Sequence, residues 1–280
     1  MPVLALLASA FLHAFWNALL KRERAPQVAV AGVLAFALLF ALGAALASRG
    51  VAFATARALG WGLAAGLFEG LYFATLAAAL ARADYGVVYT VARGGAMVIV
   101  WPAAALLLRE SVGVGGVLGA CLVGAGLALA TIRRPGERRV SRAGLAFAAA
   151  CAAAIGGYHL CYDRALAAGA RPSPLFAIAL ATALPLVMVS LRGRLRPREG
   201  AAPRSRAALR WAFAGLLCTG SFLLFLFGLE AAGAGVALTL RNTSIVFAQG
   251  LALGLGERPT RAQATGAALV AAGAILVSGW

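Results

Sequence analysis

The sequence predicts an all-α integral membrane protein with ten transmembrane helices, arranged as two inverted five-helix repeats. The 280-residue chain is 62% hydrophobic and 12% charged, with a mean hydropathy of +0.90, far above the range of soluble domains. Its apolar residues form runs of about 20, the length that a helix needs to cross a hydrocarbon core of about 30 Å. Short patterns also recur at one nearly constant offset.

Charges and Pro/Gly clusters divide the chain into ten apolar runs. Each is expected to be a helix, because lipid forces backbone groups to pair within their own segment. The first run has no basic residue ahead of it, so we expect a retained span rather than a cleaved signal peptide. The predicted spans are residues 2–20, 27–48, 58–80, 85–108, 112–132, 142–162, 173–191, 208–229, 234–255 and 260–279.

Two patterns in the first half return in the second half. The spacing E-x8-G-x6-G begins at Glu110 and again at Glu257, 147 residues later. An arginine precedes each glutamate inside the span before it, Arg93 in the first half and Arg241 in the second, 148 residues apart. Agreement of separate patterns on one offset indicates an internal repeat.

A third pattern, H-x-x-aromatic-[N/D], uses both histidines of the chain. It reads HAFWN from His13 and HLCYD from His159, an offset of 146. Each repeat therefore holds five spans, and an odd number sends the second repeat into the membrane from the opposite side, as in many secondary transporters. We place the first repeat at residues 1–134 and the second at 140–280, together forming one membrane domain.

The formal charge of +16 would suggest a nucleic-acid partner in a soluble chain. Here the basic residues gather between apolar runs, with five arginines from Arg133 to Arg142 and seven from Arg192 to Arg210. Loops at an anionic membrane face have this composition, so no nucleic-acid partner is expected. Odd-numbered loops carry 18 Lys/Arg and even-numbered loops five, which favours cytoplasmic odd loops and external termini.

The sequence resembles the ten-helix EamA-type permeases of the drug/metabolite transporter (DMT) superfamily. The resemblance rests on HAFWNALLK in the first span, YTVARGG ending in RE at Arg109 and Glu110, YHLCYD, and LRNTSIVFA followed by GER. It implies a permease or exporter in a bacterial inner (plasma) membrane. The family is often drawn with both termini inside, so resemblance and loop charge disagree on orientation.

We therefore expect a secondary transporter that moves a small metabolite, amino acid-like compound or drug by alternating access. A lipid-linked substrate flippase of the same superfamily is the alternative. An intramembrane enzyme is disfavoured because no HExxH or GxSxG motif is present. We expect no cofactor and no metal. The expected partners are the substrate and the bilayer, with monomer and homodimer both open.

Charges inside a span are costly and usually face a cavity or a partner. Arg93 and Arg241 hold equivalent places in the two halves, where two guanidinium groups can bind a carboxylate. A structural tie to helix carbonyls or to Glu69 is the alternative. Glu69 has no acidic counterpart in the eighth span and is the candidate proton-coupling carboxylate. The strip formed by Gly62, Gly66 and Gly70 around it predicts close helix packing.

The remaining substrate-binding candidates are polar and aromatic residues within the spans. The i, i+3, i+4 spacing puts the members of each histidine pattern on one helix face. Anchoring at the membrane interface is the alternative for Trp16 and Tyr162, and is our assignment for Lys21. Glu110 and Glu257 are expected to cap the span that follows each. The candidates besides the arginines are His13, Asn17, Trp16, Tyr72, Tyr89, His159 and Asn242.

Overall fold

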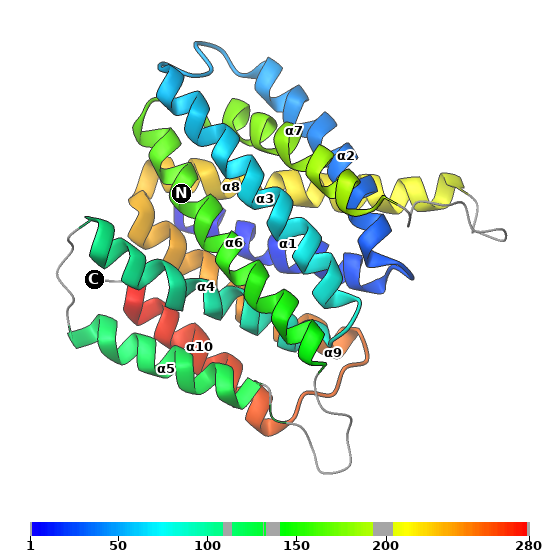
Figure 1. The fold of residues 1–280 in the computed structure, drawn as a ribbon, viewed down its shortest axis with the longest axis vertical. Helices are drawn as coiled ribbons and strands as arrows, with labels where there is room; N and C mark the ends of the chain where they lie inside the picture. The colour runs from blue at the N-terminus through cyan, green and yellow to red at the C-terminus, as the bar shows by residue number, and fades with distance from the viewer. Residues whose placement is uncertain (1, 109–113, 131, 133–140, 193–203, 279–280) are drawn as a thin grey trace.

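The computed structural model of the protein describes residues 2–108, 114–130, 132, 141–192 and 204–278. These residues fold into ten α-helices that pack into one bundle (Figure 1). Glu110 and the predicted junction between the repeats lie outside the described residues. The helices are α1 Pro2–Arg22, α2 Pro26–Ala47, α3 Ala56–Leu80, α4 Tyr85–Leu108, α5 Val114–Ala130, α6 Arg142–Ala167, α7 Pro172–Ser190, α8 Arg204–Asn242, α9 Ser244–Gly254 and α10 Arg261–Ser278.

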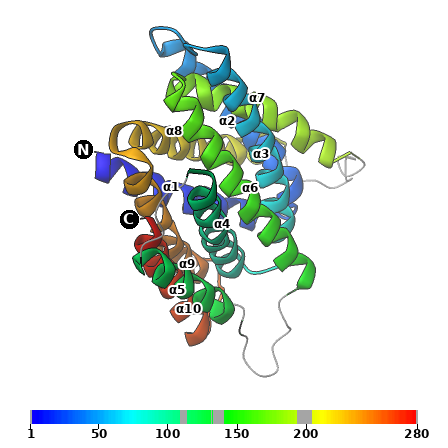
Figure 2. The same cartoon turned by 60° about the vertical axis from the view of Figure 1, so that its left-hand side comes forward.

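Six of the described helical segments are long and apolar enough to cross a membrane. They are α1, α2, α3, α6, α7 and the part of α8 from Ser205 to Ala232. Helices α5 and α10 are shorter apolar segments that lie beside each other. The start of α1 and the end of α10 lie on the same side of the bundle in Figure 2. The protein is an all-helical integral membrane protein.

Helix α8 differs from the predicted spans. The sequence predicts a break between residues 229 and 234, whereas helical backbone continues to Asn242 and is interrupted only at Thr243. A straight helix of 39 residues would measure about 58 Å, twice the thickness of a hydrocarbon core. The ribbon instead bends sharply in its orange part and turns back into the bundle (Figure 2). The predicted ninth span, 234–255, therefore combines the end of α8 with α9.

The repeated glycines form the contact between α5 and α10. A Cβ added at Gly126 would lie 2.5 Å from the carbonyl oxygen of Gly266, and one added at Gly266 would lie 2.5 Å from that of Gly126. Gly273 meets the carbonyl oxygen of Gly119 in the same way, also at 2.5 Å. Only hydrogen fits at such distances, so the spacing G-x6-G in both halves lets the two backbones touch.

The glycine strip of α3 packs as the sequence predicts, and its partner is α7. A Cβ at Gly66 would lie 2.6 Å from the carbonyl oxygen of Ala179, and one at Gly70 would lie 2.8 Å from Leu186. This close approach leaves the other faces of α3 to pack against α6 and to reach the centre of the bundle.

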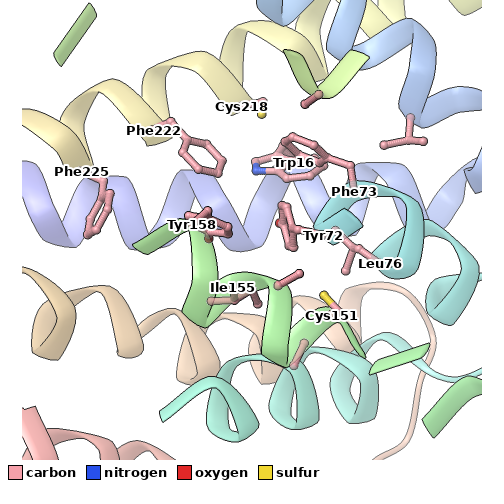
Figure 3. Packing of buried hydrophobic residues seen from close by; sticks show 14 of the residues in the cluster. Trp16, Tyr72, Phe73, Leu76, Cys151, Ile155, Tyr158, Cys218, Phe222 and Phe225 are labelled. Carbon is pink, nitrogen blue, oxygen red and sulfur yellow. The ribbon is translucent and has the colours of Figure 1, made fainter. Parts of the chain in front are cut away.

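Aromatic side chains fill the centre of the bundle between α1, α3, α6 and α8 (Figure 3). The rings of Phe176 and Phe222 stack with centroids 4.8 Å apart, and Tyr72 packs on Phe73 at 4.7 Å. Large, fully buried rings form a stiff wall because close-packed interiors leave few voids. Buried charged groups lie directly against this wall.

Candidate functional site

Charged and polar side chains meet at the centre of the bundle. His13 on α1, Arg93 on α4 and Arg241 near the end of α8 are 1%, 2% and 0% exposed. The sequence predicts all three as substrate-binding residues, and the structure brings them into direct contact. Residues about 80 and 228 positions apart in the chain thus share one buried site.

The His13 imidazole lies between the two arginines. Arg93 Nη2 contacts the ring at Nε2, and Arg241 Nη2 lies 2.9 Å from Nδ1. A neutral imidazole carries one acceptor nitrogen and one N–H, so it can accept a hydrogen bond from only one of the two guanidinium groups. The other guanidinium faces an N–H group. His13 therefore joins two cations without neutralising either.

Arg241 is held by several fixed partners. Its Nη1 donates to the Ser221 carbonyl oxygen at 2.9 Å and to the Ser9 hydroxyl. Its guanidinium plane lies over the rings of Phe222 and Phe225, at 5.2 and 4.7 Å from their centroids. Cation–π contacts of this kind contribute most where water is excluded. Arg241 thus has the structural ties that we considered as the alternative to substrate binding.

Arg93 has fewer fixed partners. Its Nη1 has no hydrogen-bond partner among the described residues. The phenols of Tyr72, Tyr89 and Tyr158 are its electrostatic neighbours, and the Tyr72 hydroxyl lies 3.3 Å from His13 Nε2. An arginine surrounded by neutral hydroxyls, with a donor left over, can bind a further acceptor.

Glu69 on α3 lies close to this group and is 0% exposed. Its Oε1 accepts a hydrogen bond of 2.6 Å from the Tyr162 hydroxyl on α6, whereas its Oε2 has no partner among the described residues. Arg241 is among its electrostatic neighbours. The sequence singles out Glu69, but nothing in it indicates the bond to Tyr162.

The two histidine patterns are not equivalent in space. His159 is buried, and its ring packs on Tyr158 at 4.5 Å and on Phe225 at 5.2 Å. Within the described residues neither of its ring nitrogens has a hydrogen-bond partner, unlike those of His13. The last residues of the patterns differ too, since Asp163 is partly exposed beside Arg164.

The other candidates lie around the same centre. Trp16 is 0% exposed, and its Nε1 is 3.5 Å from His13 Nδ1. Trp16 and Tyr162 are therefore core residues rather than interface anchors. Asn17 Nδ2 donates to the His13 carbonyl oxygen at 2.8 Å, and Asn242 Nδ2 has no partner among the described residues.

Two serines and a tyrosine at the site are not among the residues that the sequence predicts. Ser9 and Ser221 are both 0% exposed, and the Ser9 hydroxyl donates to the Ser221 carbonyl oxygen at 2.6 Å. Ser9 lies four residues before His13, so a search for polar residues on the face of His13 would have found it. Tyr158 and Ser221 carry no such signal, because only the packing of α6 and α8 brings them to the centre.

Ionic groups also tie helix ends together at the end of the bundle where α1 finishes, which we call the Lys21 end. Lys21 Nζ donates to the carbonyl oxygens of Leu80 and Ala83 at 2.9 and 2.7 Å. Glu257 accepts from the backbone N–H groups of Tyr85 and Gly86 at 2.6 and 3.0 Å. The expectation that Glu257 caps the following span is wrong, since it caps α4 from the other half of the chain.

The fold and the site together define an integral membrane protein whose apolar helices enclose a polar, charged centre. Residues 142–279 match the model of the EamA-like transporter family. This match to the second half of the chain confirms the sequence resemblance to the EamA-type permeases of the DMT superfamily. Members of this family are transporters, which fits a protein that is not an enzyme.

A solved structure titled "Crystal structure of protein" matches almost the whole chain. It has a TM-score of 0.66 and 21% sequence identity, over 98% of this chain and 95% of that one. At this identity the match supports the fold alone. No curated protein sequence matches the chain.

Proposed function

We propose that the protein is a secondary carrier of a small organic anion, such as a carboxylate-bearing metabolite or amino acid-like compound, and works by alternating access. The observation that carries the proposal is the pair of buried arginines sharing one histidine. The inner membrane of a bacterium is the location that the family resemblance implies.

The charge at the centre favours an anionic ligand. Two guanidinium groups meet there with one nearby carboxylate, that of Glu69, whose bonded oxygen is held by Tyr162. Buried charges are stable only when paired, and an unpaired buried donor costs about 1–3 kcal/mol. An anion that binds Arg93 Nη1 and Arg241 Nε supplies the missing acceptors and the missing charge.

The hydrogen-bonding character of the unpartnered atoms agrees with this choice. Among the described residues, the nitrogens without a partner at Arg93, Arg241 and Asn242 are all donors, and they match the acceptor oxygens of a carboxylate. A cationic drug would meet two like charges at the same place. The donor set therefore supports an anion over a cation as the transported species.

Alternating access draws support from the way the helices pair. The contact of α3 with α6 has its counterpart in that of α8 with α1, and α5–α10 and α2–α7 each pair a helix with its own counterpart. An inverted repeat of five helices predicts this set of contacts, because a pseudo-twofold axis exchanges the halves. Rocking of one half against the other would expose the arginines to each side in turn.

Counterflow in proteoliposomes tests the proposal. Purified protein is reconstituted and screened with labelled amino acids, dicarboxylates, phosphonates, nucleosides and cationic drugs. We expect exchange of a carboxylate, lost in Arg93→Met and partly kept in Arg93→Lys. Arg164→Met, which changes an exposed arginine outside the site, is the matched control. Exchange of cationic compounds alone, or unchanged exchange in Arg93→Met, would contradict the proposal.

A further inference from the structure

A pocket of about 530 Å³ opens at the Lys21 end of the bundle, apart from the central arginines. It lies where α1 and α9 end and where α4 and α10 begin, and Gln249, Gln263 and Thr90 are among its lining residues. Neither His13 nor the two central arginines line it. Its walls are polar, and three cations face two acids there: Lys21, Arg22 and Arg258 against Asp84 and Glu257.

Both carboxylate oxygens of Glu257, which lines this pocket, already accept hydrogen bonds. Each oxygen of its carboxylate accepts from a backbone N–H at the start of α4. Helix N-termini favour negative charge, so this carboxylate serves the helix rather than a ligand.

The donors of the pocket are not all in use. Gln263 is 5% exposed, and its Oε1 accepts from the Thr260 N–H at 2.9 Å. Gln263 is one of the residues that line the pocket, and its Nε2 has no hydrogen-bond partner among the described residues. A buried amide N–H group without an acceptor costs about 1–3 kcal/mol, which an anion bound in the pocket would recover.

A short polar path joins the pocket to the central site. Gln249 Nε2 on α9 donates to Thr90 Oγ1 on α4 at 3.0 Å and to the Gly86 carbonyl oxygen at 3.2 Å. Arg93 follows Thr90 by three residues, about 4.5 Å further along the helix axis. The bond between Thr90 and Gln249 therefore lies about one helical turn from Arg93 along α4.

We propose that this pocket is a vestibular binding site for the carboxylate substrate, from which the anion passes between Thr90 and Gln249 to Arg93. The proposal rests on the proposed transport of an anion. In it, Gln263 and the one surplus positive charge of the pocket hold the carboxylate before the α4–α9 contact opens. Gln249 then separates the outer site from the inner one.

Charge-selective labelling of an introduced cysteine tests the vestibule without knowledge of the substrate. Gln263→Cys is made in a Cys121→Ala background and treated in detergent with an anionic sulfonatoethyl or a cationic trimethylammonioethyl methanethiosulfonate. Rates are normalised to those of a free thiol. We expect an anion preference about tenfold above that of Ala25→Cys, an exposed position in the α1–α2 loop, because a basic cleft concentrates anions.

Ala252→Cys, a nearly isosteric change in the same pocket wall, gives a second reading if Gln263→Cys weakens the start of α10. Succinate is expected to slow labelling of Ala252→Cys, where Gln263 is intact, whereas the neutral succinamide is not. Equal normalised rates for the two reagents, no reaction at either cysteine, or equal protection by succinamide would overturn the vestibular site.

The same labelling in an Arg93→Met background separates this inference from the proposed function. Anion preference and succinate protection are expected to persist there while counterflow is lost. If counterflow survives Arg93→Met although the pocket remains anion-selective, the central substrate site fails and the vestibule stands. If counterflow is lost in Arg93→Met and the introduced cysteine shows no preference for the anionic reagent, the vestibular site is contradicted while the central substrate site stands.

Discussion

The two central arginines differ in their fixed partners. We therefore expect Arg241 to contribute more to the stability of the fold and Arg93 more to substrate binding. Arg241 bonds to Ser221 and Ser9 and lies over two phenylalanine rings. Arg93 contacts His13 and keeps a donor without a partner among the described residues. Sequence symmetry makes the two residues equivalent, whereas their surroundings do not.

Methionine substitutions are therefore expected to act in different ways at the two positions. Arg241→Met removes the charged hydrogen bonds to the Ser221 carbonyl and the Ser9 hydroxyl, each worth about 1.5–3 kcal/mol, although Ser9 still donates to Ser221. Arg93→Met removes a charge that few groups compensate. We expect the thermal transition in detergent to fall clearly in Arg241→Met and little in Arg93→Met, so that Arg93→Met loses transport although it stays folded. Equal destabilisation would contradict this division.

Glu69 is the buried carboxylate that we propose for proton coupling. In Glu69→Gln the amide keeps the carbonyl acceptor for the Tyr162 hydroxyl but cannot ionise. We expect the variant to lose acceleration of uptake by a pH gradient while it retains counterflow. Glu23→Gln is the control, because Glu23 lies at the surface in a salt bridge to Arg210. Loss of both uptake and counterflow would instead assign Glu69 to substrate binding or folding.

At the scale of single residues, the sequence predicts the arginines, His13 and Glu69 because a charge or a histidine in an apolar run has few purposes. It does not predict Tyr162 as the partner of Glu69 or Ser221 as the partner of Arg241. Glu69 and Tyr162 lie 93 positions apart on different helices and meet only after α3 and α6 have packed. Ser221 and Arg241 lie 20 positions apart on α8, too far to meet in a straight helix, so their bond depends on the bend of α8. The sequence therefore indicates which residues are candidates for the site, whereas their hydrogen-bond partners depend on the tertiary structure.

At the scale of helices, the repeated glutamate–glycine pattern has two separate purposes. The glycines serve the contact between α5 and α10, and Glu257 serves the start of α4. The first purpose follows from spacing, since small residues seven apart lie near one face of a helix. The second does not, because only the fold brings the α9–α10 connection to Tyr85.

Enlarging a glycine at the α5–α10 contact is expected to destabilise the protein. A valine at Gly126 would place Cβ 2.5 Å from the Gly266 carbonyl oxygen, and forced overpacking costs about 1–3 kcal/mol. Gly124→Val is the matched control on the same helix, where an added Cβ meets no atom within 4 Å. Thermal unfolding in detergent measures both. Equal transitions for the two variants would show that the backbones are not in contact.

The cap on α4 is expected to titrate. Burial raises the pKa of the Glu257 carboxyl, and its bonds to the Gly86 and Tyr85 N–H groups only partly offset this. The folded protein then binds this proton at a higher pH than the unfolded chain. The group contributes stability below the ordinary glutamate pKa, and the contribution is lost as pH rises through the raised value.

Glu257→Gln removes this titration and isolates its contribution. The melting temperature of the wild-type protein minus that of Glu257→Gln is expected to decrease as pH rises from about 4 to about 7. A difference that increases over the same interval would show that the backbone bonds outweigh burial and lower the pKa instead.

At the scale of the whole molecule, hydropathy and the recurring patterns predict an all-helical membrane protein, and the ten helices and the family match agree with it. The sequence patterns place a break at residues 229–234, whereas the helical backbone of α8 continues through these residues to Asn242. This stretch holds Glu230 and Gly233 but no proline, so its composition does not distinguish a bent helix from a turn between two helices. Orientation stays a prediction from loop charge, which reporter fusions after Trp280 would test.

The Lys21 end carries the ties that an alternating-access cycle must break. Glu257 and Gln249, on the second half of the chain, bond to the start of α4 on the first half. A short thiol cross-link in Thr90→Cys/Gln249→Cys should hold these helices together and stop exchange, with recovery on reduction. Each single cysteine variant, treated alike, controls for modification of the thiol. Full counterflow by the cross-linked protein would mean that α4 and α9 stay together throughout transport, and the substrate would then have to reach Arg93 by a route that avoids this contact.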